Sequence, residues 1–598
     1  MKKQLLNRDE IEEKYKWKLE DIYESDVLWE EELSKANEIV EQISKFQGTL
    51  ASSAQNLLNF FKESDNLDYY VDRVYVYANQ RYHQDTTVSK YQGYAANAEL
   101  LLVNASGATS FANPELLEIS DEKFKSFYQE KPELLKYKRL IDEIKRTKDH
   151  VLDKKSEEIL AKASEIAMGP DNIFHMFNDA DIKFPKIKDE NGNEVELSHG
   201  NFIHYMQSYD RRVREDAFKC LYSSYKAYGN TVSAIFTSNL KQENFYSQLR
   251  NYSSSRAMEL DKSEIPESVY DNLIETVHKH LPALHKYLKD RKNTLNVDKL
   301  HMYDIYVPLV QGVEKEYSFE EAKEIVADAL QPMGDEYVSI LKEGMNSRWI
   351  DVYENRNKRS GAYSWGAYGT HPYVLLNYHG KLNDVFTLAH EMGHSMHTYF
   401  SNKNQPITYA GYKIFVAEVA STCNEALLMH YMLEKTDDVK IRKYLLNHQL
   451  EEFRTTLFRQ TMFAEFEHIV HSKIQAGEAP TMEKLNKIYH DLNVLYYGED
   501  MVVDEEIDYE WMRIPHFYTP FYVYQYATGY SAATAFAKII LEGKEEAANR
   551  YIKEFLCGGS SKSPIELLKA AGVDMSSSEP VDKALESFEE YLKEYLDL

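Results

Sequence analysis

Apolar residues recur every three or four positions through most of the first half of the chain, which predicts a succession of amphipathic helices. Ser25 or Asp26 is placed to cap the first of these helices, and the helix is expected to end near Gly48. Leucine and phenylalanine residues at positions 57, 58, 60 and 61 mark a second helix. A longer third helix is predicted from about Leu67 to Val103.

One segment departs from this helical pattern. Residues 182–187 and 195–197 flank Asn191-Gly192, which is the strongest short turn signal for two antiparallel strands. A hairpin is therefore predicted, and a domain boundary is placed close to it. The expected division is an N-terminal helical domain, residues 1–200, and a second domain, residues 201–598. Helices are predicted to resume at residues 201–228 and 230–250.

The pattern changes again at Gly361. Residues 361–369 are rich in glycine and aromatic residues and indicate a loop with a bent strand, and residues 371–378 indicate a strand. Asn383 or Asp384 can cap the helix that follows, which has an apolar face of Val385, Leu388, Ala389 and Met392. The edge of the 371–378 strand is placed to hold an extended peptide by main-chain hydrogen bonds. A buried core strand is the equally weighted alternative.

Composition narrows the class of protein. A chain of 598 residues is too long for one core, so at least two lobes are expected. The net charge of -27 argues against nucleic acid or an anionic membrane as the main partner. Three scattered cysteines, no apolar run of membrane-spanning length and a polar N-terminus predict a soluble cytoplasmic protein without disulfides.

Candidate chemistry is concentrated in His390-Glu391-Met392-Gly393-His394. On a helix, His390 and His394 lie one turn apart on one face, where two imidazoles can bind one metal ion. Glu391 then reaches a metal-bound water rather than the metal itself. Because only three positions of the pattern are fixed, roughly 0.07 chance occurrences are expected in a chain of this length. The assignment therefore needs a third ligand.

The third ligand decides the class of metal site. One large class has a further histidine six residues after the second, where this chain has Phe400. The alternative is a carboxylate from a later helix, and the apolar helical stretch 413–428 carries two, Glu418 and Glu425, on one face. The thermolysin-type pattern would make Glu425 the metal ligand. That pattern also has Asp four residues after the glutamate, and this chain has Met429 there. Glu418 is therefore favoured as the ligand, with Glu425 accepting a ring N–H from a ligand histidine.

Together with these residues, several longer stretches carry a resemblance that covers most of the chain and is most specific between residues 361 and 529. They are residues 388–397 (LAHEMGHSMH), 415–422 (FVAEVAST), 458–467 (FRQTMFAEFE), 515–518 (PHFY) and 522–530 (YVYQYATGY). The chain resembles the oligoendopeptidase F branch of the thimet oligopeptidase family of zinc peptidases.

The resemblance implies a mostly α fold of two lobes, with a deep central channel and a small β-sheet next to the metal helix. Residues 201–598 would then be the zinc peptidase catalytic domain. It implies one zinc ion held by His390, His394 and Glu418, and short unstructured peptides as cytoplasmic substrates. Glu391 matches the family's catalytic base and Glu425 an acid that supports the ligands.

A late cluster of aromatic residues matches the family's substrate-binding and oxyanion-stabilising groups. Tyr524 is the better match for the tyrosine that contacts the transition state, and His516 is next; Tyr518 and Tyr522 are further candidates for substrate binding, as is Tyr373 on the earlier strand. The segment between His516 and Tyr522 is shorter than in the thimet branch and contains Thr519-Pro520 instead of a glycine-rich loop.

The expected reaction is hydrolysis of internal peptide bonds, with a zinc-activated water and Glu391 as general base. Two rivals remain. A peptide-binding module with a purely structural metal would need a fourth protein ligand, and a zinc exopeptidase would need a charged pocket for a peptide terminus.

Overall fold

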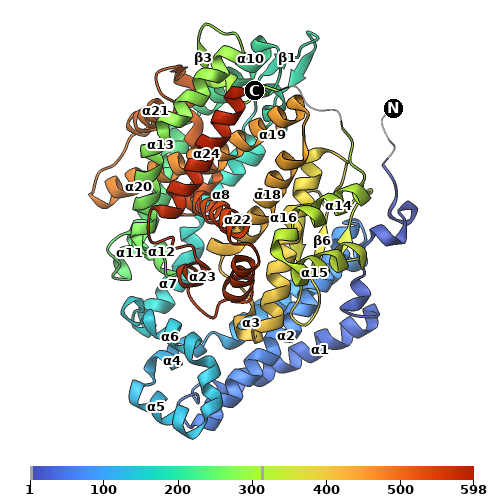
Figure 1. The fold of residues 1–598 in the computed structure, drawn as a ribbon. Helices are drawn as coiled ribbons and strands as arrows, with labels where there is room; N and C mark the ends of the chain where they lie inside the picture. The colour runs from blue at the N-terminus through green and yellow to red at the C-terminus, as the bar shows by residue number, and fades with distance from the viewer. Residues whose placement is uncertain (1–4, 311–314) are drawn as a thin grey trace. The chain divides into compact units, whose positions relative to one another are not determined.

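The computed structural model describes residues 5–310 and 315–598, and the chain folds into two compact units (Figure 1). Unit 1 comprises Met1–Lys148, Lys315–Met432 and Phe536–Val573. Unit 2 comprises Asp149–Glu314, Leu433–Ala535 and Asp574–Leu598. Residues 1–4, on which the expectation of a polar N-terminus partly rests, lie outside the described residues. The predicted boundary at residue 200 and the predicted central channel stay predictions.

Unit 1 is mainly helical, with one small sheet. Its helices are α1 (Asp26–Ile43), α2 (Ala54–Gln84), α3 (Ser89–Thr109), α4 (Ala112–Glu118), α5 (Asp121–Glu130), α6 (Lys138–Arg146), α14 (Phe319–Ala329), α15 (Asp335–Asn346), α16 (Leu382–Asn404), α17 (Ile407–Ala410), most of α18 (Ile414–Lys435), the end of α22 (Tyr524–Tyr551) and α23 (Pro564–Ala571). A continuous core joins α1, α2 and α3 to the sheet. Among its largest buried side chains are Trp17, Trp29 and Tyr77.

The first helix follows the prediction, since the Ser25 side chain caps α1 by accepting the N–H of Leu28. The prediction of the next two helices was wrong. α2 continues without a break through the polar residues 62–66, and the chain leaves the helix only at Asp85. There the Asp85 carboxylate accepts the N–H of Thr87 at 3.0 Å, and this local turn separates α2 from α3.

The sheet of unit 1 consists of β4 (Ile350–Asp351), β6 (Tyr373–Leu375) and β5 (Tyr363–Trp365), in that order. β6 pairs in parallel with β4 and antiparallel with β5, so it has a neighbour on both edges. All three of its residues are buried. The Tyr373 ring packs edge-on against Trp17, and its hydroxyl donates to the Lys18 carbonyl at 3.2 Å. The alternative of a buried core strand is therefore the correct one, and burial removes Tyr373 from the candidate substrate contacts.

Unit 2 is also mainly helical. Its helices are α7 (Lys154–Ala167), α8 (Gly169–His175), α9 (His199–Met206), α10 (Arg211–Ala227), α11 (Gly229–Leu249), α12 (Ser255–Asp261), α13 (Glu267–Thr294), α19 (Val439–Glu452), α20 (Arg459–Gln475), α21 (Met482–Tyr497), the start of α22 and α24 (Glu579–Asp597). A short parallel pair joins β3 (Leu300–His301) to β7 (Met501–Val502).

The predicted hairpin is confirmed in unit 2. β1 (Lys186–Lys188) pairs antiparallel with β2 (Glu194–Glu196), and Gly192 adopts a φ of 82° in the connecting turn. The helix predicted over residues 201–228 is interrupted between α9 and α10. Asp210 begins a new helix there, because its side chain accepts the N–H of Arg212.

The predicted mostly α fold with a small sheet beside the metal-motif helix is confirmed. Ser364 of β5 and Ser395 of α16 share a hydrogen bond of 2.8 Å, which fastens the sheet to that helix. Within residues 5–310 and 315–598, no helix has both the length and the apolar content that crossing a membrane requires.

Candidate functional site

The first candidate metal residues lie on α16, a helix of 23 residues whose N-cap is Lys381 and not the predicted Asn383 or Asp384, because the helix already begins at Leu382. Val385, Leu388, Ala389, Met392 and Met396 are buried at the helical spacing that the sequence predicts. This face holds the helix against unit 1 and leaves His390 and His394 on an adjoining, partly exposed face. Their rings are 4.9 Å apart between centroids and nearly perpendicular.

The second element of the site is α18, which crosses α16 at very short range. A Cβ atom on Gly393 would lie 2.6 Å from the Cα of Ser421 and 2.7 Å from the carbonyl oxygen of Ala420, so only glycine permits this approach. Asn424 fastens the crossing, because its side chain donates to the Ala389 carbonyl at 3.1 Å and accepts from the Tyr337 hydroxyl at 2.9 Å.

The crossing brings Glu418 to both histidines. One carboxylate oxygen, Oε2, lies 3.3 Å from Nε2 of His390 and 3.3 Å from Nε2 of His394. The same oxygen accepts the hydroxyl of Ser421 at 3.0 Å. Burial alone would raise the pKa of Glu418, but the hydrogen bonds from His390 and His394 outweigh it and hold the pKa well below its usual range. Glu418 is therefore an ionised acceptor that faces two imidazole nitrogens.

Glu425 occupies the other side of the first histidine. Its Oε2 is 3.3 Å from Nδ1 of His390, whose Nε2 faces Glu418. Burial opposes a proton on His390, but the two carboxylates outweigh burial and raise the pKa of this ring well above its usual value. An acid at Nδ1 fixes the ring so that Nε2 points into the site, which is the arrangement predicted for Glu425.

Glu391 lies beside the ligands and is nearly buried, with 7% of its surface exposed. Its Oε2 atom is enclosed and meets no hydrogen-bond donor among the described residues. Burial raises the pKa of Glu391, and the neighbouring His390 and His394 oppose this rise only in part. A buried carboxylate with an unused oxygen is suited to accept a proton from a water molecule in the site.

The donor set fits a divalent cation. The ligating atoms of His390, His394 and Glu418 all lie within 4.8 Å of one another, so one ion can meet all three. Two imidazole nitrogens and one carboxylate oxygen are the set found in catalytic zinc sites that keep one position open. A cation at this point would replace the protons that the two rings otherwise share with Glu418.

His397, three residues after His394, does not face the cluster. It is 1% exposed and stacks on Tyr412, with ring centroids 3.8 Å apart. Burial lowers its pKa to about 3, so the ring is neutral and packs as an aromatic side chain.

The late aromatic candidates all belong to unit 2. His516 meets the hydroxyl of Tyr526 at 3.2 Å and stacks on Tyr522, with ring centroids 5.9 Å apart. Tyr518 is 9% exposed and stacks on Phe174 with centroids 4.2 Å apart, which is a packing contact.

Tyr524 is the first residue of α22. It is 3% exposed, and its ring centroid lies 5.0 Å from that of Tyr270. Burial and Glu467 raise its pKa, so its hydroxyl keeps its proton and can donate. The assigned roles of His516, Tyr518, Tyr522 and Tyr524 toward a substrate stay predictions.

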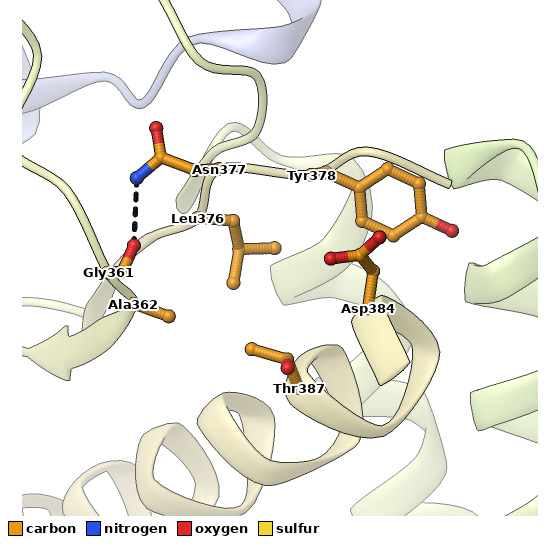
Figure 2. Close-up of a pocket in the computed structure, with 7 residues that line it drawn as sticks. All are labelled: Gly361, Ala362, Leu376, Asn377, Tyr378, Asp384 and Thr387. Atoms are coloured by element: carbon orange, nitrogen blue, oxygen red, sulfur yellow. Dashed lines mark hydrogen bonds between the residues drawn. The ribbon is translucent and has the colours of Figure 1, made fainter. Parts of the chain in front are cut away.

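A hollow of about 230 Å³ adjoins the metal helix in unit 1 (Figure 2). Its walls come from the residues just before β5, the residues just after β6 and the first two turns of α16, and the lining residues are Gly361, Ala362, Leu376, Asn377, Tyr378, Asp384 and Thr387. Sequence reasoning treated Asp384 only as a helix cap and gave Thr387 no role. The sequence feature that could have pointed to Thr387 is its position on the same helix, three residues before His390.

Sequence reasoning also missed two side chains of α18: Ser421, which holds the Glu418 carboxylate, and Asn424, which fastens the helix to α16. Ser421 lies three residues after Glu418, on the same side of the helix. Asn424 lies six residues after Glu418 and points to a different face, so periodicity from Glu418 does not identify it. Their polar side chains in an otherwise apolar stretch were the usable signal.

Comparison with known proteins places these features in a family. A model of peptidase family M3 matches residues 204–587, and a model of oligopeptidase F matches residues 115–184. The chain is 49% identical to oligopeptidase PepF of Bacillus subtilis over 595 residues, which is 100% of this chain and 89% of that protein. It is 43% identical to group B oligopeptidase PepB of Streptococcus agalactiae, over 99% of this chain and 98% of that protein.

Two solved structures are also similar to this chain. Oligoendopeptidase-F from Enterococcus faecium is similar with 40% identity and a TM-score of 0.75, over 96% of this chain and 99% of that one. A protein from Chlamydophila abortus is similar with 36% identity and a TM-score of 0.93, over 99% of this chain and 100% of that one.

Proposed function

This chain belongs to peptidase family M3 as an oligopeptidase F, and from that premise we propose that it is a zinc-dependent endopeptidase that cleaves internal bonds of short, unstructured peptides. Membership makes it a metallo-oligopeptidase, which hydrolyses peptides with a bound metal. The proposal adds the identity of the metal, the residues that hold it, the base and the position of the cleaved bond.

One observation carries the proposal: the ligating atoms of His390, His394 and Glu418 converge within 4.8 Å beside a buried Glu391. These three residues would hold the zinc ion. When bound there, zinc supplies a Lewis acid that polarises the peptide carbonyl and acidifies a water molecule. Within the described residues the candidate group has three members and not four, which favours a catalytic site over a closed structural one.

Glu391 performs the proton transfers. Its unused Oε2 accepts the proton of the attacking water and then delivers it to the leaving amine. Burial, which raises the pKa of Glu391, brings the carboxylate closer to the pH at which such a base is most effective. Glu425 orients His390 through Nδ1, and Ser421 holds the carboxylate of Glu418 through a hydrogen bond.

Tyr524 and His516 are assigned to the developing oxyanion of the substrate, with Tyr522 and Tyr518 as candidate substrate contacts. The Tyr524 phenol keeps its proton and can donate one hydrogen bond to this oxygen. A well-placed donor of this kind contributes about 3 kcal/mol of transition-state stabilisation. These assignments rest on the residues that match the family.

The decisive experiment is a digest of a mixed library of short peptides, with cleavage products identified by mass spectrometry and zinc measured in the same sample. Internal cuts that stop when a chelator removes the zinc support the proposal. Losses of single terminal residues would make the protein an exopeptidase. Stoichiometric zinc without any hydrolysis would make the metal structural.

Glu391→Gln is the matched variant for the base. It keeps the size of the side chain but removes the proton acceptor, so zinc should remain bound while turnover falls by a factor of at least about 1,000. Peptide cleavage at the wild-type rate with zinc bound would contradict the role of Glu391.

A further inference from the structure

The residues that line the hollow beside α16 favour the binding of one kind of side chain from another molecule. Leu376, the methyl group of Ala362 and the ring of Tyr378 supply apolar walls, and the Asp384 carboxylate lies at one end (Figure 2). Figure 2 shows the side chains of Leu376, Thr387 and Asp384 arranged around the open space. A volume of about 230 Å³ is sufficient for one long side chain.

The position of the hollow relates it to the candidate site. Thr387 precedes His390 by three residues on α16, so both lie on one face of the helix. A rise of about 1.5 Å per residue puts them about 4.5 Å apart along the helix axis. A peptide bond that reaches His390 therefore has one of its flanking side chains within reach of the hollow.

The polar groups of the side chains that line the hollow are acceptors. The Asn377 amide nitrogen donates to the carbonyls of Arg359 and Gly361, and the Thr387 hydroxyl donates to the Asn383 carbonyl, so these donors are already used. Oxygen lone pairs of Thr387 remain available. A side chain that enters the hollow must therefore be a donor to make hydrogen bonds.

Hydrogen bonds to one carboxylate oxygen hold Asp384 in place, and the other carboxylate oxygen is unused. Its Oδ2 accepts the backbone N–H groups of His379 at 3.2 Å and Lys381 at 2.7 Å. Its Oδ1 has no hydrogen-bond donor among the described residues. A fixed carboxylate oxygen next to apolar walls favours a cation on an aliphatic stem, which is the structure of lysine and arginine.

We propose that this hollow is a side-chain subsite of the peptidase, which takes a lysine or arginine of the substrate next to the cleaved bond and pairs its cation with Asp384. The aliphatic stem lies along Leu376 and Ala362, and the terminal nitrogen donates to Asp384 Oδ1 and the Thr387 oxygen. This inference rests on the proposed function, because it concerns the peptide that the zinc site cleaves.

The test uses short peptides that are identical except at one position, which holds lysine or norleucine, or arginine or citrulline. Each pair differs mainly in the positive charge. The position is moved along the peptide, cuts are located by mass spectrometry, and kcat/KM is measured for wild type. At one position flanking the cut, the charged member should be favoured about tenfold, the size of one charge-assisted hydrogen bond.

Asp384→Asn removes the charge and keeps an oxygen for the two backbone N–H groups, so the preference should fall to about one. Glu354→Gln removes an exposed acid that does not line the hollow and should leave the preference unchanged. Ala362→Leu fills the hollow and should disfavour any long side chain relative to alanine at that position. This variant decides the question if Asp384→Asn does not fold.

The outcomes separate the two proposals. Chelator-sensitive cleavage of the uncharged peptides with no preference for lysine or arginine at any position would overturn the subsite but not the peptidase. The same result follows if the preference persists in Asp384→Asn. Failure to cleave any peptide of the set would instead overturn the proposed function.

Discussion

A Cβ atom built on Gly393 would lie 2.6 Å from the Cα of Ser421, so α16 and α18 cross with their backbones in contact. This contact occurs one residue before the ligand candidate His394 and three residues after the ligand candidate Glu418. The short crossing is what allows a glutamate side chain to reach two imidazoles with one oxygen atom. Glycine at position 393 is therefore a requirement of the helix pair and of the candidate metal site between the two helices.

Gly393→Ala should force the two helices apart. We expect the free energy of unfolding to fall by about 3 kcal/mol, the upper part of the range for overpacking, and zinc affinity to fall with it. Urea unfolding and zinc titration of the purified variant measure the two effects. Gly107→Ala in α3 is the control, since a Cβ there meets nothing within 4 Å and alanine should stabilise that helix by up to about 1 kcal/mol. Equal stability of the two variants would contradict the requirement.

Glu425 should support zinc binding through His390 without binding the metal itself. Glu425→Gln keeps an oxygen that can accept the Nδ1–H group, so zinc affinity should fall by about tenfold. Glu425→Ala removes the acceptor and should lower the affinity by about a hundredfold. Competition with a fluorescent zinc chelator measures both. Loss of all zinc in both variants would indicate that Glu425 is a ligand, and unchanged affinity would indicate that it has no role at the site.

Helical periodicity was enough to group the candidate metal residues. His390, His394, Glu418 and Glu425 belong to two helices, and each pair falls on one face at intervals of four or seven. The distance between the two helices was not predictable, because it depends on a contact between Gly393 and Ser421 that no local pattern encodes.

The predictions of the fold that were wrong also depended on contacts that no local sequence pattern encodes. The end of α2 at Asp85 depends on a side-chain hydrogen bond to Thr87 in a stretch without glycine or proline, so no strong helix-stop signal was present. The burial of Tyr373 depends on strands β4 and β5, which both precede β6 in sequence and pair with its two edges. Long-range pairing of this kind decides which strand has a free edge.

Glu467 in unit 2 predicts a dependence of stability on pH. It is 1% exposed and accepts the N–H of Phe521 at 2.7 Å, and Phe521 has a φ of 51°, a strained value for a phenylalanine. Burial raises the pKa of Glu467 to about 8, and the nearby buried Glu243 also has a raised pKa. The folded protein therefore holds a proton on Glu467 at pH values where the unfolded chain has lost it.

Because the folded state binds this proton more tightly, the stability that it contributes is lost as the pH rises from about 4.5 to about 8. The slope for one such group is at most about 1.4 kcal/mol per pH unit. Glu467→Gln cannot titrate and still accepts the Phe521 N–H, so it should become more stable relative to wild type as the pH rises. Urea unfolding of both proteins at pH 5, 6.5 and 8 measures the difference, and a constant difference would contradict the protonated state of Glu467.

The role of a tyrosine hydroxyl can be tested by a substitution to phenylalanine, which removes only the hydroxyl oxygen. Tyr524→Phe should lower kcat by a factor of about 100 to 1,000 with little change in KM, because a hydroxyl that donates only to the transition state contributes nothing to binding the substrate. Tyr595→Phe is the matched control. Its hydroxyl is also buried and has no partner among the described residues, and Tyr595 has no assigned role, so kcat and KM should both stay within about twofold of wild type. Steady-state kinetics on one internally cleaved peptide, with zinc content and unfolding midpoints measured alongside, distinguishes the two variants. If Tyr524→Phe keeps the same kcat as Tyr595→Phe, Tyr524 is not the oxyanion donor, and the assignment by family match at residue 524 is wrong.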